Sequence, residues 1–154
     1  MSEFKLTTEI VARSQNQAWD HAKREWSLVE VYEADEPETC LCGHNPIIEI
    51  CVLHNHVNGN QAEVGNCCVK KFMGIESHLI FDGLKRVQKD ISAALNDAAI
   101  EHASSRQWIT PWEKTFLIST RRKRVLSAKQ GETRRRINIK VVGRFAAASR
   151  RPPA

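Results

Sequence analysis

The sequence predicts an α+β protein, in which a small metal-binding module made of a β-hairpin and a short helix is combined with further helices. Strand-forming residues alternate with turn residues between positions 28 and 64. Apolar residues recur at helical spacing on both sides of this region. All five cysteines fall between Cys40 and Cys68, where a bound metal could replace the hydrophobic core that so short a segment lacks.

The composition is that of an ordered protein, with 42% hydrophobic and 27% charged residues. No apolar run reaches the roughly 18 residues of a membrane span, and the first residues lack the apolar core of a signal peptide. We therefore expect a cytoplasmic protein with no membrane partner. In a reducing compartment, clustered cysteines favour metal ligation over disulfides.

The first expected helix spans about residues 15–27, because Ser14 and Gln17 have the spacing of a capping box and apolar residues follow at helical intervals. Strand-forming residues predict a strand over 28–34. The acidic segment 35–38 contains a proline and is expected to form a loop.

The central segment predicts a hairpin followed by a short helix. Residues 47–53 and 61–64 are the two strands, and the Asn-Gly pair at 58–59 is the turn between them. Asn66 is a candidate cap for a helix over 67–73.

The remaining chain predicts helices. Periodic apolar residues favour one long helix over 83–104, and Thr110 opens another helix with a capping box and an early proline. A last helix is expected from Ser127, with Gly143 as its stop. The expected organisation is a helix and acidic loop over 1–37, a metal module over 38–75, a long helix over 76–108, a basic helical extension over 109–145 and a disordered tail over 146–154.

The concentrated chemistry is a set of potential soft-metal ligands in the central segment. Cys40 and Cys42 are followed by glycine, as in a zinc knuckle, although one residue separates them instead of two. A further ligand is expected where a helix begins, because the helix dipole favours a thiolate there, and Cys68 is preferred with Cys67 as the alternate. The full set of donors is Cys40, Cys42, His44, Cys51, His54, His56, Cys67 and Cys68.

This pattern resembles the small treble-clef zinc fingers of phage, plasmid and viral proteins, over about residues 38–75. The resemblance implies a knuckle, a β-hairpin and a short helix around one zinc ion, and a fourth ligand from the strand before the turn. Cys51 is then the first choice and His54 the second. The residues that carry it are Cys40, Cys42, Gly43, His44, Ile48, Cys51, Asn55, Asn58, Gly59, Val64, Gly65 and Cys68.

Three other interpretations of the cluster stay open. The cysteines could be small buried apolar residues, or four of them could hold an iron–sulfur cluster. A His-metal finger nuclease would use His54 as general base, with Asn66 and His78 beside a divalent ion. No acidic residue adjoins His54 to orient it, so this nuclease is the least favoured reading.

Charge is divided unequally along the chain. Residues 106–154 hold 14 Lys or Arg and two acids, a net charge of +12, whereas residues 1–105 carry −7. Such a basic segment is typical of contact with the phosphates of DNA or RNA. Trp108 and Trp112 could stack on bases, but a tryptophan at a helix start is more often part of the core. The candidate phosphate contacts are Arg121, Arg122, Lys123, Arg124, Lys129, Arg134, Arg135, Arg136, Lys140 and Arg144.

The sequence therefore predicts a non-enzymatic, nucleic-acid-binding protein of a phage or other mobile element, folded around one zinc ion. Its phosphate contacts would be independent of base sequence. The alternative is an adaptor or inhibitor that binds a host protein, because the same arginines also suit an acidic protein surface.

Overall fold

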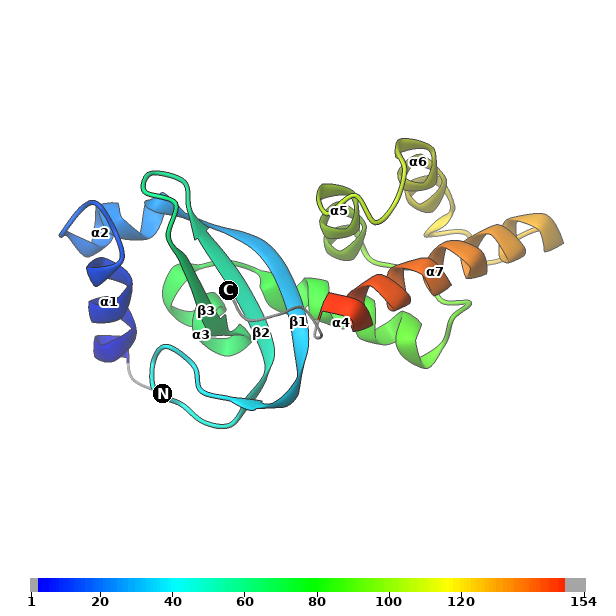
Figure 1. Ribbon diagram of the computed structural model, residues 1–154. Helices are drawn as coiled ribbons and strands as arrows, with labels where there is room; N and C mark the ends of the chain where they lie inside the picture. The colour runs from blue at the N-terminus through cyan, green and yellow to red at the C-terminus, as the bar shows by residue number, and fades with distance from the viewer. Residues whose placement is uncertain (1–2, 149–154) are drawn as a thin grey trace. The chain divides into compact units, whose positions relative to one another are not determined.

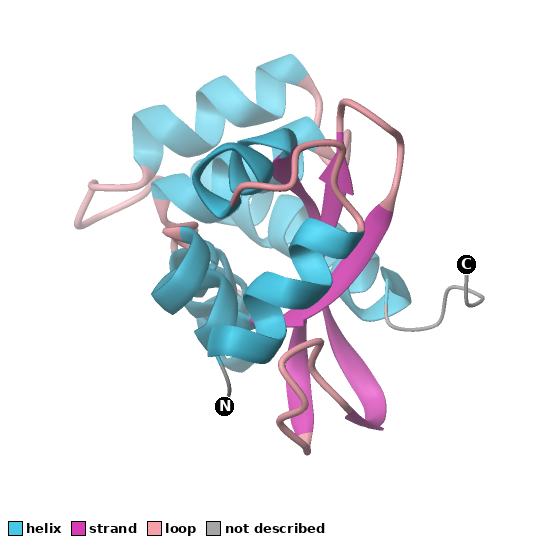
Figure 2. Cartoon of the chain, turned by 90° about the vertical axis from the view of Figure 1, so that its left-hand side faces the viewer, coloured by secondary structure: helices cyan, strands magenta, loops and turns pink. Residues whose placement is uncertain are grey.

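The computed structural model describes residues 3–148, and the chain divides into two compact units, Met1–His78 and Leu79–Ala154. The expected α+β class is confirmed, because a three-stranded antiparallel sheet is combined with helices (Figures 1 and 2). The elements are, in chain order, α1 (Glu3–Ala12), α2 (Trp19–Ala22), the short 3-10 helix η1 (Lys23–Glu25), β1 (Trp26–Glu38), β2 (Ile47–Asn55), β3 (Gln61–Gly65), α3 (Asn66–Met73), α4 (Ser77–Lys89), α5 (Asp97–Ser105), α6 (Pro111–Thr120) and α7 (Ala128–Ala148).

The sheet of the first unit has the order β1-β2-β3, as Figure 1 shows. Cys51 lies at its centre, opposite Val31 on β1 and Val64 on β3. The hairpin and its Asn-Gly turn are confirmed, and Gly59 takes a φ of +82°, which favours glycine. The acidic segment expected as a loop is the end of β1 instead. Pro37 is tolerated there because β1 is an edge strand, where one row of backbone N–H groups has no strand partner.

A buried polar pair fastens the hairpin to the segment before it. Asn55 is fully buried, and its Oδ1 accepts hydrogen bonds from the backbone of the turn while its Nδ2 donates to Glu25 at 2.9 Å. Glu25 also accepts the backbone N–H groups of Gln15 and Asn16. Burial raises the pKa of Glu25, but these hydrogen bonds outweigh burial and the net shift is downward. The ionised carboxylate therefore holds together segments that are distant in the sequence.

The N-terminal helix lies earlier than expected. The helix predicted over 15–27 is found only in part: α1 covers Glu3–Ala12, and within the predicted range only 19–25 is helical, as α2 and η1. Ser14 does not cap a helix start: its hydroxyl donates to the carbonyl of Ile10 at the end of α1 and accepts the indole N–H of Trp26. Leu6 and Ile10, four residues apart, are both fully buried and give α1 its apolar side.

The short helix after the hairpin is confirmed as α3, but its cap is not. Gly65 is the N-cap residue of α3 and makes no side-chain capping bond. Asn66 is the first helical residue, and its amide bridges Glu49 on β2 and the hydroxyl of Ser77. Asn66 therefore ties the helix to its neighbours instead of capping it.

The second unit is helical, and its expected long helix is interrupted. The helix predicted over 83–104 is wrong, because α4 ends at Lys89 and α5 begins at Asp97. Asn96 causes the new start: its side chain accepts the N–H of Ala99 as an N-cap and donates to the carbonyl of Leu79. The apolar periodicity continues across the break because both helices bury their faces in one core.

The helix starts at α6 and α7 are as expected. Thr110 and Glu113 form the capping box of α6, and Ser127 with Gln130 makes the same reciprocal pair before α7. Gly143 does not stop α7, which continues to Ala148, so 146–148 of the expected tail are helical and 149–154 lie outside the described residues.

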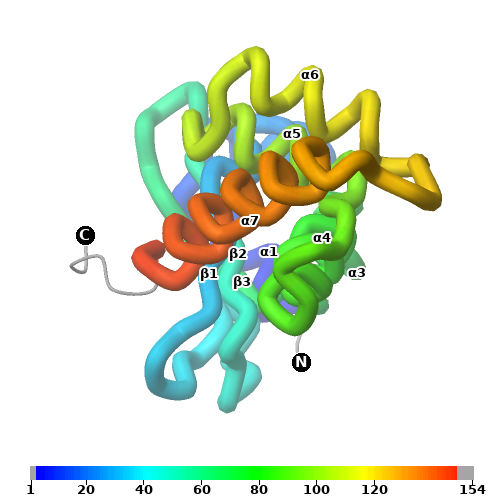
Figure 3. Tube along the Cα trace, turned by 90° about the vertical axis from the view of Figure 1, so that its right-hand side faces the viewer, coloured from blue at the N-terminus to red at the C-terminus, as the bar shows by residue number. Residues whose placement is uncertain are grey.

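The core of the second unit is built where α7 meets the other helices. Figure 3 shows α7 between α4 and α6. Phe81 and Phe145 pack edge to face at 6.1 Å, and His102 packs against Trp108 at 5.4 Å. The fully or nearly fully buried apolar side chains here include Phe81, Leu84, Leu95, Ile100, Leu117, Ile137, Val141 and Phe145. Among the described residues, no helix has the length and apolarity to cross a membrane.

Candidate metal centre and basic surface

Three cysteines of the first unit converge on one point. Cys40 and Cys42 come from the loop between β1 and β2, and Cys68 comes from the first turn of α3. Their Sγ atoms all lie within 4.8 Å of one another, and Cys42 Sγ is 3.3 Å from Cys68 Sγ. Each of the three side chains is 2% exposed. The group could hold a metal ion.

The loop that carries Cys40 and Cys42 folds as a tight turn around the sulfur atoms. The N–H of Gly43 donates to the carbonyl of Cys40 at 2.8 Å, and Gly43 has a φ of +91°, a conformation that favours glycine. The N–H of His44 approaches Cys42 Sγ at 3.4 Å, and the N–H of Gly65 approaches Cys40 Sγ at 3.2 Å. Such donors stabilise negative charge on sulfur, which is the form that binds metal.

The donor set fits a tetrahedral thiolate site. Sulfur atoms bound at ~2.3 Å around one zinc ion lie about 3.8 Å apart, close to the spacing found here. Burial raises the pKa of the Cys68 thiol, and its contacts with Cys42 and Cys40 raise this pKa further. A bound cation would reverse that preference by stabilising the thiolate.

The other sequence-predicted donors lie outside this group. Cys51 is fully buried on β2, and burial raises the pKa of its thiol to about 12. Its Sγ is not within 4.8 Å of all three cluster sulfurs. His54 follows on the same strand and is partly exposed, whereas Cys67 is exposed beside Cys68. The structure thus brings together Cys40, Cys42 and Cys68 and leaves these three donors apart.

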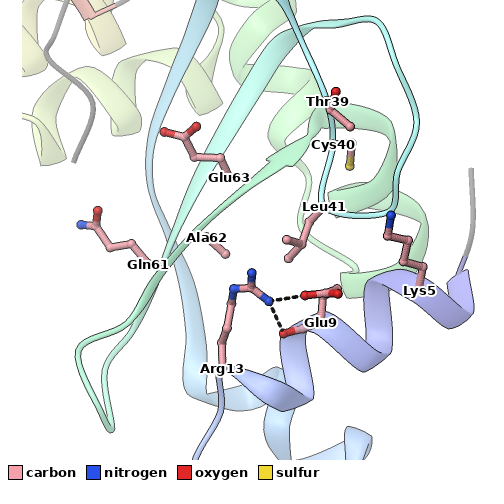
Figure 4. A pocket seen from close by; sticks show the side chains of 9 residues that line it. All are labelled: Lys5, Glu9, Arg13, Thr39, Cys40, Leu41, Gln61, Ala62 and Glu63. Carbon is pink, nitrogen blue, oxygen red and sulfur yellow. Dashed lines mark hydrogen bonds and ion pairs between the residues drawn. The ribbon is translucent and has the colours of Figure 1, made fainter.

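A shallow hollow of about 470 Å³ opens beside the cluster, with Cys40 on its wall (Figure 4). Glu9 of α1 and Arg13, just after α1, form an ion pair on one side, and residues 61–63 of β3 lie across from them. Charges of both signs line the hollow, and its arginine is already paired with Glu9. The hollow therefore offers no concentrated charge to a ligand.

The three residues expected in a His-metal finger nuclease, His54, Asn66 and His78, do not form a common metal site among the described residues. Asn66 is engaged by Glu49 and Ser77, and His78 lies 3.4 Å from Glu76. Within residues 3–148, neither His54 nor His78 belongs to a group of three or more potential metal ligands. The geometry gives no support to general-base chemistry at His54.

The basic residues of the second unit divide by exposure. Arg121 is half-buried and pairs with Asp97 at 2.9 Å, and Lys140 pairs with Glu113 at 2.5 Å. The exposed members of the predicted set are Arg122, Lys123, Arg124, Lys129, Arg135, Arg136, Lys140 and Arg144. Most of the predicted phosphate contacts are therefore accessible to a polyanion.

Arg134 is the exception and corrects the sequence prediction. Its side chain is 7% exposed, and Nη2 donates to the carbonyl of Thr120 at 2.7 Å. That carbonyl lies at the end of α6, where it also accepts the backbone N–H of Lys123 at 3.1 Å. Arg134 therefore satisfies a helix end and is unavailable to phosphate.

This role predicts different outcomes for two adjacent arginines. Arg134→Ala should lower the free energy of unfolding by about 1–2 kcal/mol, because the Thr120 carbonyl loses the charged one of its two donors and the packing of the buried Arg134 side chain is lost. Arg135→Ala, at an exposed position, should change it by less than about 0.5 kcal/mol. Urea denaturation of both variants measures the difference, and equal stabilities would contradict the structural role.

The two tryptophans at the start of the basic segment also differ in exposure. Trp108 is 6% exposed and belongs to the core, as expected. Trp112 is 61% exposed, so the expectation that it is buried is wrong. Its ring stacks on Phe116, with centroids 5.5 Å apart and an interplanar angle of 16°. The sequence contains the i, i+4 spacing of this pair but no signal for which side of α6 is buried.

Comparison of the chain with protein-family models, with curated proteins and with solved structures found no match.

Proposed function

We propose that the protein binds nucleic acid through the second unit and that one zinc ion stabilises the first unit. The three-cysteine group supports the metal part of this proposal, because thiolates select zinc among the common divalent ions. Structural zinc sites have four ligands. Cys51 is the proposed fourth, because it is fully buried on β2 opposite Val64, the residue before Gly65, whose N–H approaches Cys40 Sγ. Its thiol would have to move toward the three cluster sulfurs.

The observation that carries the nucleic-acid part is a basic stripe along α7. Lys129, Arg136, Lys140 and Arg144 are exposed and separated by seven, four and four residues. With 3.6 residues per turn, these intervals place all four on one side of the helix. We call this set the α7 stripe.

The stripe is long enough to contact several phosphates of one strand. A rise of 1.5 Å per residue spreads its four charges over about 22 Å. Glu132 is the one acidic residue in α7, and the exposed residues Arg122–Arg124 add positive charge just before the helix. Phosphates would displace counterions from such a surface without reading the bases.

Salt dependence of binding tests the proposal. The variant Lys129→Ala, Arg136→Ala, Arg144→Ala removes three charges and keeps the Lys140–Glu113 pair. The matched control, Arg24→Ala, Lys70→Ala, Lys71→Ala, removes the same charge from exposed positions of the first unit. Fluorescence anisotropy of labelled oligonucleotides between 50 and 200 mM salt gives the slope of log K against log salt.

We expect the α7 variant to reduce the magnitude of this slope by about 2–3, since each lost phosphate contact contributes about 0.7–0.9. The control should keep the wild-type slope within about 0.5. If the wild-type protein binds neither single strands nor duplexes at 50 mM salt, the proposal is overturned and a protein partner becomes the better explanation.

A further inference from the structure

The stacked pair Trp112 and Phe116 is the largest exposed aromatic feature on the described residues of the second unit. Trp112 lies in the first turn of α6, with 61% of its surface open to solvent. Its nearly parallel contact with Phe116 fixes the ring at one face. A tryptophan held in this way loses little conformational entropy when a second flat ring stacks on it.

The aromatic pair lies beside the α7 stripe. Glu113, the neighbour of Trp112, bonds to Lys140 of the stripe at 2.5 Å. Near the other end of α6, Thr120 accepts from Arg134. The two helices therefore run past each other in opposite directions, and the Glu113–Lys140 pair joins the first turn of α6, which carries Trp112, to the stripe.

Glu113, the carboxylate that follows Trp112 in the sequence, is already engaged. Glu113 accepts the backbone N–H of Thr110 in the capping box and the ammonium of Lys140. These interactions keep the pKa of Glu113 low in spite of its partial burial. Glu113 is thus neutralised by Lys140, and Arg136 and Arg144, about one turn to either side of Lys140 on α7, add positive charge to the stripe.

We infer that Trp112, backed by Phe116, is a stacking platform for an unpaired base of a single strand whose phosphates follow the α7 stripe. This inference rests on the proposed function and narrows its ligand to single-stranded nucleic acid. Inside a duplex both faces of each base are occupied by neighbouring bases, so along the length of a strand only an unpaired base can cover the indole. Stacking does not depend on base identity, because every base has a π-face.

Binding of matched ligands tests the inference in the full-length protein. The probes are a dT oligonucleotide, a blunt duplex of equal length and an abasic strand with the same phosphates. Trp112→Ala removes the platform, and Ile118→Ala, a change at another exposed apolar position of α6, is the control. Thermal denaturation of each variant checks that the exposed substitutions leave the fold intact.

We expect Trp112→Ala to weaken binding of the dT strand at least about fivefold and to change duplex binding less than twofold. The loss should vanish with the abasic strand, and the dT strand should quench tryptophan fluorescence in wild-type protein more than in Trp112→Ala. If Trp112→Ala weakens binding of the strand and of the duplex equally, or weakens neither, the stacking platform is overturned. The proposed phosphate contacts of the α7 stripe are not affected by that result. Failure of the wild-type protein to bind any probe overturns the proposed function itself.

Discussion

Cys68→Ser should abolish stoichiometric zinc binding and unfold the first unit at temperatures where the wild-type unit is stable. Cys68 joins α3 to the loop that carries Cys40 and Cys42, so its loss separates two segments that the metal would otherwise connect. Structural zinc contributes about 10–16 kcal/mol of binding free energy in small modules. That range is as large as the total stability of a typical domain.

The neighbouring cysteine provides a matched control. Cys67 is exposed and one residue away, so Cys67→Ser makes the same chemical change in the same helix turn without touching the cluster. Native mass spectrometry of proteins purified without added zinc or chelator should find one zinc ion in wild type and Cys67→Ser, and none in Cys68→Ser. The melting temperature of Cys68→Ser should fall by at least about 15 °C, because each 1 kcal/mol corresponds to about 4–8 °C in a domain of this size.

Two results would count against the metal site. One is a wild-type protein that carries no metal and keeps its melting temperature in chelator. The other is Cys68→Ser with a full zinc ion. The first result would make the buried cysteines ordinary core residues, and the second would exclude Cys68 from the ligands of the bound ion.

Local signals predicted the parts of the fold in which neighbouring residues determine the structure. The Asn-Gly turn, the Thr110 capping box and the glycine after Cys42 act through hydrogen bonds or backbone angles within a few residues. The expected helix starts at 110 and 127 and the expected hairpin were therefore found in place.

The predictions that were wrong concern residues whose structure depends on partners far away in the sequence. The spacing of Ser14 and Gln17 predicted a helix start. Instead, the Ser14 hydroxyl donates to the Ile10 carbonyl at the end of α1 and accepts the indole N–H of Trp26. Arg134 was grouped with Arg135 and Arg136 by charge, although its spacing of three, seven and eleven residues from Ile137, Val141 and Phe145 places it on the buried side of α7. For the adjacent cysteines the position relative to the helix start was sufficient, since Cys68 is buried in the cluster and Cys67 is exposed.

Gly83→Ala should destabilise the second unit by at least about 2 kcal/mol, although alanine is the better helix former. A Cβ at position 83 of α4 would lie 2.2 Å from Asn96 Oδ1 and 2.7 Å from the Cβ of Ala99. Asn96 cannot turn aside, because its side chain accepts from Ala99 and donates to Leu79. Overpacking costs about 1–3 kcal/mol, and loss of the cap of α5 adds about 1 kcal/mol.

Gly143→Ala is the control that separates packing from helix propensity. Gly143 also lies inside a helix, but no atom lies within 4 Å of the Cβ that alanine would place there. This substitution should therefore stabilise the unit by about 0.5–1 kcal/mol. Urea denaturation of the two variants should give shifts of opposite sign. If both variants were stabilised, α4 and α5 would not be packed through Gly83 and Asn96, and the break between them at Asn96 would lack its physical cause.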